Sequence, residues 1–239
     1  MNKCRESAQS GYAPAQYQLG QCYEESIGVE RNLAKAFRLY WQASDNCRPA
    51  RERLNKDSYQ GQLAKWLKKA VNRKDLADAD LAEAMCMLGS CYQHGWGVDD
   101  DMSSAVEWYR KAVDADGHVS PDALCGLGDC YAGGKGVKQD WEKAVALYRQ
   151  AAEMDAPEAQ YLLARCYDDG HGVETDMKEA VRLYKKAANN VCENKGYYGH
   201  VGAMRCLGDC YTTGNGIRKN AKQAAVWYAK ATELEAASK

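Results

Sequence analysis

The chain has 239 residues and a formal net charge of −1. It therefore lacks the basic excess that phosphate binding requires, and we expect no nucleic-acid partner. Hydrophobic residues make up 46% of the chain, but no apolar run approaches the length of a membrane span. The first ten residues contain no apolar stretch of the kind that forms a signal peptide. We therefore expect a soluble intracellular protein, located in the cytoplasm.

The first predicted element is a helical hairpin over residues 13–46, preceded by a polar lead-in that forms at most an incomplete helix. Ala15, Leu19 and Tyr23 lie at i, i+4 and i+8, which places them on one face of a helix. The loop that follows reads ESIGV and has a single glycine. Asn32 is of a type preferred at helix N-caps, and it marks the start of the second helix.

Residues 48–73 depart from this pattern. Leu19 and the next equivalent leucine, Leu88, are 69 positions apart (88 − 19), which leaves room for one further copy between them. This copy has no glycine loop and no cap, so we predict a shortened, degenerate hairpin followed by a charged connector. Two interpretations stay open: the segment has drifted in sequence and still stacks, or it changes the curvature of the stack.

Regular hairpins follow at four further places, with predicted ranges 81–115, 121–155, 157–189 and 200–233. Each first helix carries a leucine, each second helix begins at a cap, and a tyrosine lies eight residues after the cap. The leucines are Leu19, Leu88, Leu127, Leu163 and Leu207; the caps are Asn32, Asp101, Asp140, Asp176 and Asn220; the tyrosines are Tyr40, Tyr109, Tyr148, Tyr184 and Tyr228. Five copies that agree at these positions predict a stack of helical hairpins. The buried tyrosine hydroxyls will need hydrogen-bond partners.

Inserts separate some of the hairpins, and the longest spans residues 190–199. Insertions in repeat proteins fall in loops at one edge, which is often the binding edge. Tyr197 and Tyr198 in this insert are either a contact for a partner or side chains that fold back on the stack. The last residues predict a polar helical tail that caps the stack.

The shared pattern reads A-x3-L-G-x-x-Y-x-x-G-x-G-V-x-x-D-x-x-K-A-x-x-W-Y-x-K-A, and residues 123–151 and 203–231 match it almost throughout. It resembles the Sel1-like repeat, a relative of the tetratricopeptide repeat. The resemblance implies an all-α fold, a right-handed α-α superhelix of about six stacked hairpins, and we expect residues 1–239 to form this single solenoid domain. Members of the family are adaptors and scaffolds, so the resemblance implies a non-enzymatic protein that holds a protein or peptide.

Motifs that would indicate catalysis do not occur in the sequence. S-x-x-K, which matters because some family relatives are associated with β-lactam binding, is missing, as are the P-loop, H-E-x-x-H and G-x-S-x-G motifs. Gly133, Gly134 and Gly136 flank Lys135 in a phosphate-like pattern, but they form the inter-helix loop of the repeat and no strand precedes them. The four histidines fall in loops or at helix edges. We expect no enzyme activity, no cofactor and no metal site.

The eleven cysteines allow two interpretations. Five share one repeat position on the predicted buried face, where a free cysteine acts as a small apolar core residue: Cys22, Cys91, Cys130, Cys166 and Cys210. The odd total and the lack of a repeated cysteine pair favour reduced thiols. The alternative is a ladder of disulfides, because the cysteine-rich secreted branch of the resembled family pairs cysteines on adjoining helices. For the function, that branch implies a thiol- or metal-dependent or hydrolase activity as the alternative.

In tetratricopeptide-type stacks the first helices line a concave groove, and the resemblance implies the same here. First-helix positions that packing does not use carry more acidic than basic residues, so we expect a protein or peptide partner with basic residues. An ordinary solvated helix face is the other interpretation. The predicted partner-binding residues are Tyr17, Gln21, Asp129, Tyr161, Arg165, Asp168, Arg205 and Asp209.

Overall fold

The computed structural model describes residues 2–9, 12–44, 47–73, 78–115, 119–192 and 197–237. The contacts of the chain group it into two compact units. The N-terminal unit is Met1–Ala123, and the C-terminal unit is Leu124–Cys192 together with Tyr197–Lys239. Each unit is built of helical hairpins, as the repeat predicts. That the whole chain forms one domain stays a prediction.

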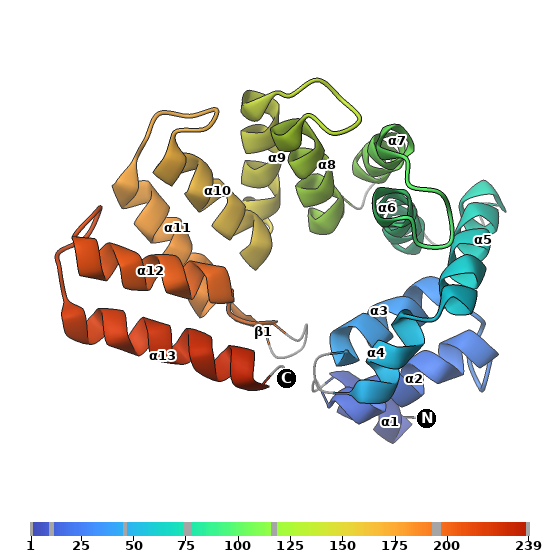
Figure 1. Ribbon diagram of the computed structural model, residues 1–239. Helices are drawn as coiled ribbons and strands as arrows, with labels where there is room; N and C mark the ends of the chain where they lie inside the picture. The colour runs from blue at the N-terminus through green and yellow to red at the C-terminus, as the bar shows by residue number, and fades with distance from the viewer. Residues whose placement is uncertain are drawn as a thin grey trace. The chain divides into compact units, whose positions relative to one another are not determined.

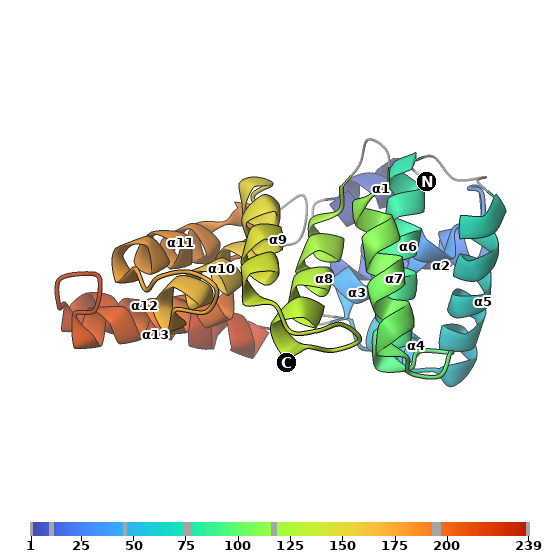
Figure 2. The same cartoon turned by 90° about the horizontal axis from the view of Figure 1, so that it is seen from above.

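The N-terminal unit begins with a helix that the sequence predicted only as an incomplete lead-in. Its helices are α1 (Asn2–Gln9), α2 (Ala13–Glu25), α3 (Leu33–Ala43), α4 (Arg48–Leu54), α5 (Asp57–Arg73), α6 (Asp78–His94), α7 (Met102–Val113) and the start of α8 (Pro121–Gly133). α1 packs on α2, α2 pairs with α3, and α6 pairs with α7 (Figure 1). Figure 2 shows α6 and α7 side by side along their length.

The C-terminal unit continues the repeat. After α8 it contains α9 (Trp141–Glu153), α10 (Pro157–Asp169), α11 (Met177–Asn189), β1 (Val191–Cys192), β2 (Tyr197–Tyr198), α12 (Val201–Thr213) and α13 (Ala221–Ala237). α10 pairs with α11 and α12 with α13, and between hairpins α9 packs on α10 and α11 on α12 (Figure 1). The all-α class and the stacking of helical hairpins are confirmed.

The 190–199 insert holds a small element that the sequence did not predict. β1 and β2 pair in antiparallel fashion, with Val191 opposite Tyr198 and Cys192 opposite Tyr197. Each strand has only two residues, which leaves the fold class unchanged. The predicted partner contact of the Tyr197 and Tyr198 side chains lies outside the described part of the structure.

All five predicted caps act as caps. The side-chain oxygen of each cap residue accepts a hydrogen bond from a backbone N–H in the first turn of its helix, which satisfies one of the donors left over at a helix start. Each cap residue also closes its hairpin, because its own N–H donates to the carbonyl of a tyrosine in the preceding helix. The pairs include Asp140 with Tyr131 at 2.9 Å and Asp176 with Tyr167 at 3.0 Å. The cap therefore fixes both the start of the second helix and its distance from the first.

Close packing inside each hairpin depends on the residue after the repeat leucine. A Cβ added to Gly128 would lie 2.5 Å from Cε1 of Tyr148, and one added to Gly20 would lie 2.5 Å from Cε1 of Tyr40. A side chain at this position would overlap the tyrosine ring of the second helix. Ala164 in α10 replaces the glycine in one hairpin and is completely buried.

The degenerate hairpin forms, as predicted, from α4 and α5. Ala50 and Leu54 in α4 and Leu63 and Leu67 in α5 are buried, so both of its helices contribute to the core. α4 has seven residues, whereas α2, α8, α10 and α12, which are first helices of regular hairpins, have 13 each. At about 1.5 Å per residue it covers about half the length of a regular first helix.

The short α4 changes the neighbours of α3. α3 packs on α4 and also contacts α5 and α6, so a second helix of one hairpin reaches the first helix two hairpins further along. Two ion pairs join α3 to α6. Lys35 pairs with Asp80 at 2.8 Å, and Arg38 pairs with Glu83 at 3.1 Å.

Candidate protein-binding site

The hydroxyls of the repeat tyrosines donate hydrogen bonds to side chains of the first helix in the same hairpin. In the C-terminal unit Tyr148 donates to Asp129 at 2.7 Å, Tyr184 to Asp168 at 3.0 Å, and Tyr228 to Asp209 at 2.6 Å. The three acceptors are all predicted binding residues. Asp129 and Asp209 are exposed and Asp168 is half-buried, so these carboxylates are fixed by the fold and still reach solvent.

The same bond occurs in the N-terminal unit with different acceptors. Tyr40 donates to Glu24 at 2.7 Å, and Tyr109 donates to Gln93 at 2.7 Å. Counted from the repeat leucine, the acceptors lie two or five residues later along the chain. The sequence predicted that these hydroxyls need partners, and the structure places the partners on the first helix.

Tyr161 lies between two rings rather than standing alone as a surface anchor. Its ring is stacked on that of His200 with centroids 4.1 Å apart, and the Tyr184 ring is 6.1 Å away. Arg165, one turn later on α10, is exposed and donates to Asp169 at 3.3 Å. These contacts place Tyr161 and Arg165 together on the surface of α10.

His200 has a structural task that the sequence did not indicate. Its Nδ1 accepts from the N–H of Ala203 at 3.1 Å, so it is the N-cap of α12. Its Nε2 is 2.9 Å from Oε2 of Glu158. Both ring nitrogens are thus engaged, and the ring that stacks on Tyr161 ties α10 to the start of α12. This arrangement positions a helix and contains no nucleophile.

The remaining predicted binding residues are held by neighbours on their own unit. Arg205 donates to both oxygens of Glu235 at 2.7 and 2.6 Å. Gln21 donates to the hydroxyl of Tyr17 at 3.3 Å, and the Tyr17 ring is 5.5 Å from that of Tyr40. Tyr17 and Gln21 belong to the N-terminal unit and the other six predicted residues to the C-terminal unit.

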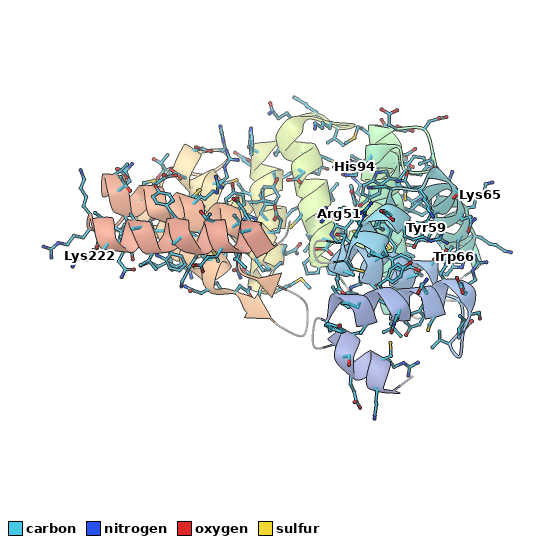
Figure 3. The ribbon with its side chains drawn as sticks, turned by 60° about the horizontal axis from the view of Figure 1, so that its bottom comes forward. Arg51, Tyr59, Lys65, Trp66, His94 and Lys222 are labelled. Carbon is cyan, nitrogen blue, oxygen red and sulfur yellow. The ribbon has the colours of Figure 1, made fainter. Side chains whose placement is uncertain are left out.

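An aromatic pocket in the N-terminal unit was missed by the sequence analysis. It lies between α3 and α6 and has a volume of about 280 Å³. Its aromatic wall consists of Phe37 and Trp41 from α3 and Trp96 from the loop after α6, with ring centroids 5.9 to 6.1 Å apart. His94, the last residue of α6 and labelled in Figure 3, is stacked on Trp96 at 4.7 Å. Trp41 and His94 are exposed, so the pocket presents an accessible aromatic surface.

The cysteine thiols are poorly suited to chemistry. No disulfide joins any two cysteines of the described residues, and four of the five repeat-position cysteines are buried. The exception is Cys22, which is half-buried and corrects the prediction at that position. Burial raises the pKa of Cys130, Cys166 and Cys210 to about 11 each. At neutral pH they are therefore protonated, whereas the thiolate is the nucleophile and the metal ligand.

Neither a metal-binding cluster nor a membrane-spanning helix occurs among the described residues. No group of three or more histidine, cysteine, aspartate or glutamate side chains in this part of the chain is arranged to hold a metal ion. None of its helices combines the length and the hydropathy needed to cross a bilayer.

Comparison with known proteins identifies the repeat. The family model of the Sel1 repeat matches residues 13–46, 82–117, 121–155, 157–191 and 202–235. These ranges coincide with the five regular hairpins, and the degenerate segment 48–73 is not matched. The comparison with curated proteins finds no match.

The solved structures that are similar to the chain include two with more than 25% sequence identity. One is a Sel1 repeat protein from Oxalobacter formigenes, with 28% sequence identity, a TM-score of 0.57, and coverage of 93% of this chain and 74% of that one. The other is a protective antigen present in uropathogenic Escherichia coli strains that displays an SLR fold. It has 26% identity and a TM-score of 0.61, and the match covers 98% of this chain and 48% of the antigen.

Proposed function

The chain belongs to the Sel1 repeat family, and we propose that it is a non-enzymatic scaffold whose first-helix surface binds a basic segment of another protein. Sel1 repeat proteins are generally protein-interaction scaffolds. Beyond that general role, we propose that the partner segment is basic. It assigns the contact to the acidic side chains of α8, α10 and α12 in the C-terminal unit.

The observation that carries this proposal is the set of carboxylates held by tyrosine hydroxyls, Asp129, Asp168 and Asp209. A hydroxyl occupies one oxygen of each carboxylate and leaves its charge in place. In the part of the chain that the structure describes, no lysine or arginine forms an ion pair with any of the three. Each keeps a second oxygen that can accept from a lysine or arginine of a partner.

The fixed geometry of these carboxylates favours binding. An unrestrained surface side chain loses rotamer freedom when it is immobilised at an interface, and a side chain that the fold already holds loses less. The basic residues of the same surface, Arg165 and Arg205, are paired with Asp169 and Glu235. The surface therefore offers anchored negative charge, with Tyr161 as an adjacent ring for apolar contact.

The proposal has two further parts, which concern the kind of partner and the location of the protein. We propose no nucleic-acid partner, because the exposed unpaired charge of this surface is negative and would repel phosphate. We keep the cytoplasm as the proposed location, since cysteines without disulfide bonds, as in the described residues, are typical of a reducing compartment. The alternative of a thiol- or metal-dependent activity is disfavoured by the raised pKa of the buried cysteines.

The test uses a matched pair of triple variants. Asp129→Asn/Asp168→Asn/Asp209→Asn removes three charges, while each asparagine oxygen still accepts from its tyrosine, so the hairpins stay closed. The control, Glu142→Gln/Glu153→Gln/Glu233→Gln, removes three exposed charges from the second helices α9 and α13. Peptides selected on the wild-type protein from a random display library are then titrated against all three proteins at low salt.

The selected peptides are expected to be rich in lysine and arginine. Three exposed charge pairs at about 0.5 kcal/mol each amount to about tenfold in affinity, which the Asn triple variant should lose. Added salt should weaken the wild-type complex and have little effect on what binding the Asn variant retains. If the control triple variant loses binding and the Asn variant keeps it, the partner docks on the second helices and the proposal is wrong.

A further inference from the structure

The aromatic pocket of the N-terminal unit is formed by residues that depart from the repeat. Phe37, five residues after its cap, occupies a position that is valine in three other hairpins: Val106, Val145 and Val181. Trp41, nine residues after the cap, occupies a position that is basic in the same three hairpins: Arg110, Arg149 and Lys185. Trp96 lies in the glycine loop where three other hairpins carry Lys135, His171 and Asn215.

These three departures meet in space, although Trp96 lies far from Phe37 and Trp41 in the sequence. Trp96 is 5.9 Å from Phe37 and 6.1 Å from Trp41, centroid to centroid. The meeting depends on the short α4, which allows α3 to contact α6, and on the Lys35–Asp80 and Arg38–Glu83 ion pairs between these helices. Packing does not require Trp41, because its side chain is 56% exposed.

The pocket has acidic side chains beside its aromatic wall. Glu83 from α6 and Asp122 from the start of α8 line it together with Arg38. Arg38 pairs with Glu83 through Nη1, 3.1 and 3.2 Å from the two carboxylate oxygens. The charged residues that line the pocket are therefore two acids and one base, and the pocket carries a net negative charge next to exposed ring faces.

We propose that this pocket binds an arginine side chain presented by a partner protein. A guanidinium group is planar, stacks on the faces of tryptophan rings, and donates paired hydrogen bonds to a carboxylate, so it matches both walls at once. The volume of about 280 Å³ is just below the range of about 300–1,000 Å³ typical of small-molecule sites, which suits a single side chain. This site is separate from the first-helix carboxylates of the C-terminal unit and does not depend on them.

The binding is measured on the full chain with N-acetyl-arginine methylamide as the probe. The indole N–H signals in nitrogen–proton correlation spectra report on each tryptophan. We expect the signals of Trp41 and Trp96 to shift together, with a dissociation constant in the millimolar range for a single side chain. Trp141, which stacks on His171 in the C-terminal unit, provides an internal control whose signal should not move.

Two variants introduce the residue that other hairpins carry at the same repeat position, so the repeat fold is able to accommodate each of them. Trp41→Arg and Phe37→Val, followed through the Trp96 signal, should each weaken binding about tenfold through loss of the cation–π and stacking contacts. Asp122→Asn should weaken it by a smaller factor. Arg149→Ala, at the position of α9 equivalent to Trp41, is the matched control and should leave the affinity unchanged.

Uncharged and methylated probes distinguish an arginine side chain from other possible occupants of the pocket. The citrulline analogue has nearly the shape of arginine without its charge and should not bind. Equal shifts with citrulline or with a phenylalanine analogue would assign an apolar ligand and overturn the proposal. Tighter binding of a trimethyl-lysine probe than of arginine would also overturn it. The proposal would also be wrong if the protein self-associates, Trp41→Arg abolishes this self-association, and the arginine probe gives no response. The occupant of the pocket would then be a second copy of the chain.

Discussion

The two units use the same repeat and join their hairpins in different ways. In the C-terminal unit each second helix packs on the first helix of the next hairpin, α9 on α10 and α11 on α12. In the N-terminal unit α3 packs on α4 and also reaches α5 and α6. Six fewer residues in one helix therefore change which surfaces of the stack meet. The aromatic pocket and the α3–α6 ion pairs lie where this change occurs.

The first hairpin of the N-terminal unit and the last hairpin of the C-terminal unit also differ in how deeply the tyrosine–acid bond is buried. In the N-terminal unit Glu24 is 7% exposed, Tyr40 is fully buried, and Arg53 from α4 pairs with the same carboxylate. In the last hairpin the corresponding bond joins Tyr228 to an exposed Asp209. One hydrogen-bond motif thus serves as a core element in the first hairpin and as part of the surface in the last.

The largest expected effect comes from removing the buried acid. Glu24→Ala leaves the Tyr40 hydroxyl without its acceptor and Arg53 without its counter-charge. The Arg53 side chain is 31% exposed, so water offsets part of the loss. We expect the free energy of unfolding to fall by about 3 kcal/mol, at the lower end of the range for breaking a buried pair. Urea unfolding of the full chain, followed by circular dichroism, measures it.

Asp209→Ala is the matched change in the C-terminal unit. The Tyr228 side chain is 36% exposed, and water can accept from its hydroxyl once the carboxylate is gone. The expected loss is below about 1 kcal/mol. Equal losses at Glu24 and Asp209 would show that the difference in burial between the two units has no energetic consequence.

The second prediction concerns the glycine that packs against the repeat tyrosine in every regular hairpin except the one formed by α10 and α11. Gly128→Leu would drive a branched side chain into the Tyr148 ring, since even a Cβ would lie 2.5 Å from Cε1. We expect a loss of about 1–3 kcal/mol through overpacking, measured as a fall in the melting temperature. An unchanged melting temperature would mean that the two helices of this hairpin separate without cost.

Gly61 in α5 is the control, because it belongs to the hairpin that has lost the repeat. A Cβ added there meets nothing within 4 Å. Gly61→Ala should raise the stability by about 0.5–1 kcal/mol, since alanine loses less backbone entropy in a helix than glycine. Opposite signs at Gly128 and Gly61 would separate a glycine needed for packing from one that is not.

The sequence predicted the features that are local and repeated. Caps such as Asp140 and repeat leucines such as Leu127 follow from periodicity and from propensities that act over a few residues. The partners of the tyrosine hydroxyls were not predicted. Asp129 and Asp168 occupy different repeat positions, so no single position in the repeat identifies the acceptor.

The aromatic pocket could not be located from periodicity because its residues belong to different hairpins. Phe37 and Trp96 come together where α3 contacts α6, beyond the short α4. A usable signal was nevertheless present. Phe37, Trp41 and Trp96 each differ from what most other hairpins carry at the same position, and such departures from an internal repeat mark residues that the repeat itself does not require.

The smallest expected effect is a dependence of stability on pH that arises at the caps. Hydrogen bonds from the hydroxyl and then the backbone N–H of Ser104 lower the pKa of Asp101 in the N-terminal unit. Hydrogen bonds from the backbone N–H and then the side chain of Lys143 lower the pKa of Asp140 in the C-terminal unit. A carboxylate with a lowered pKa in the folded state stabilises the fold above its unfolded pKa of about 3.9, and this contribution is lost as the pH falls.

Asparagine tests this dependence directly, because Asn32 and Asn220 already cap hairpins of the same protein. Asp101→Asn and Asp140→Asn keep an oxygen that accepts from the helix N–H groups and remove the titrating charge. The double variant should lose less stability than the wild type between about pH 6 and pH 3, compared by thermal unfolding at each pH. The two single variants should contribute similarly, because both carboxylates cap regular hairpins. An identical fall in wild type and double variant would mean that the acid sensitivity of the fold lies elsewhere.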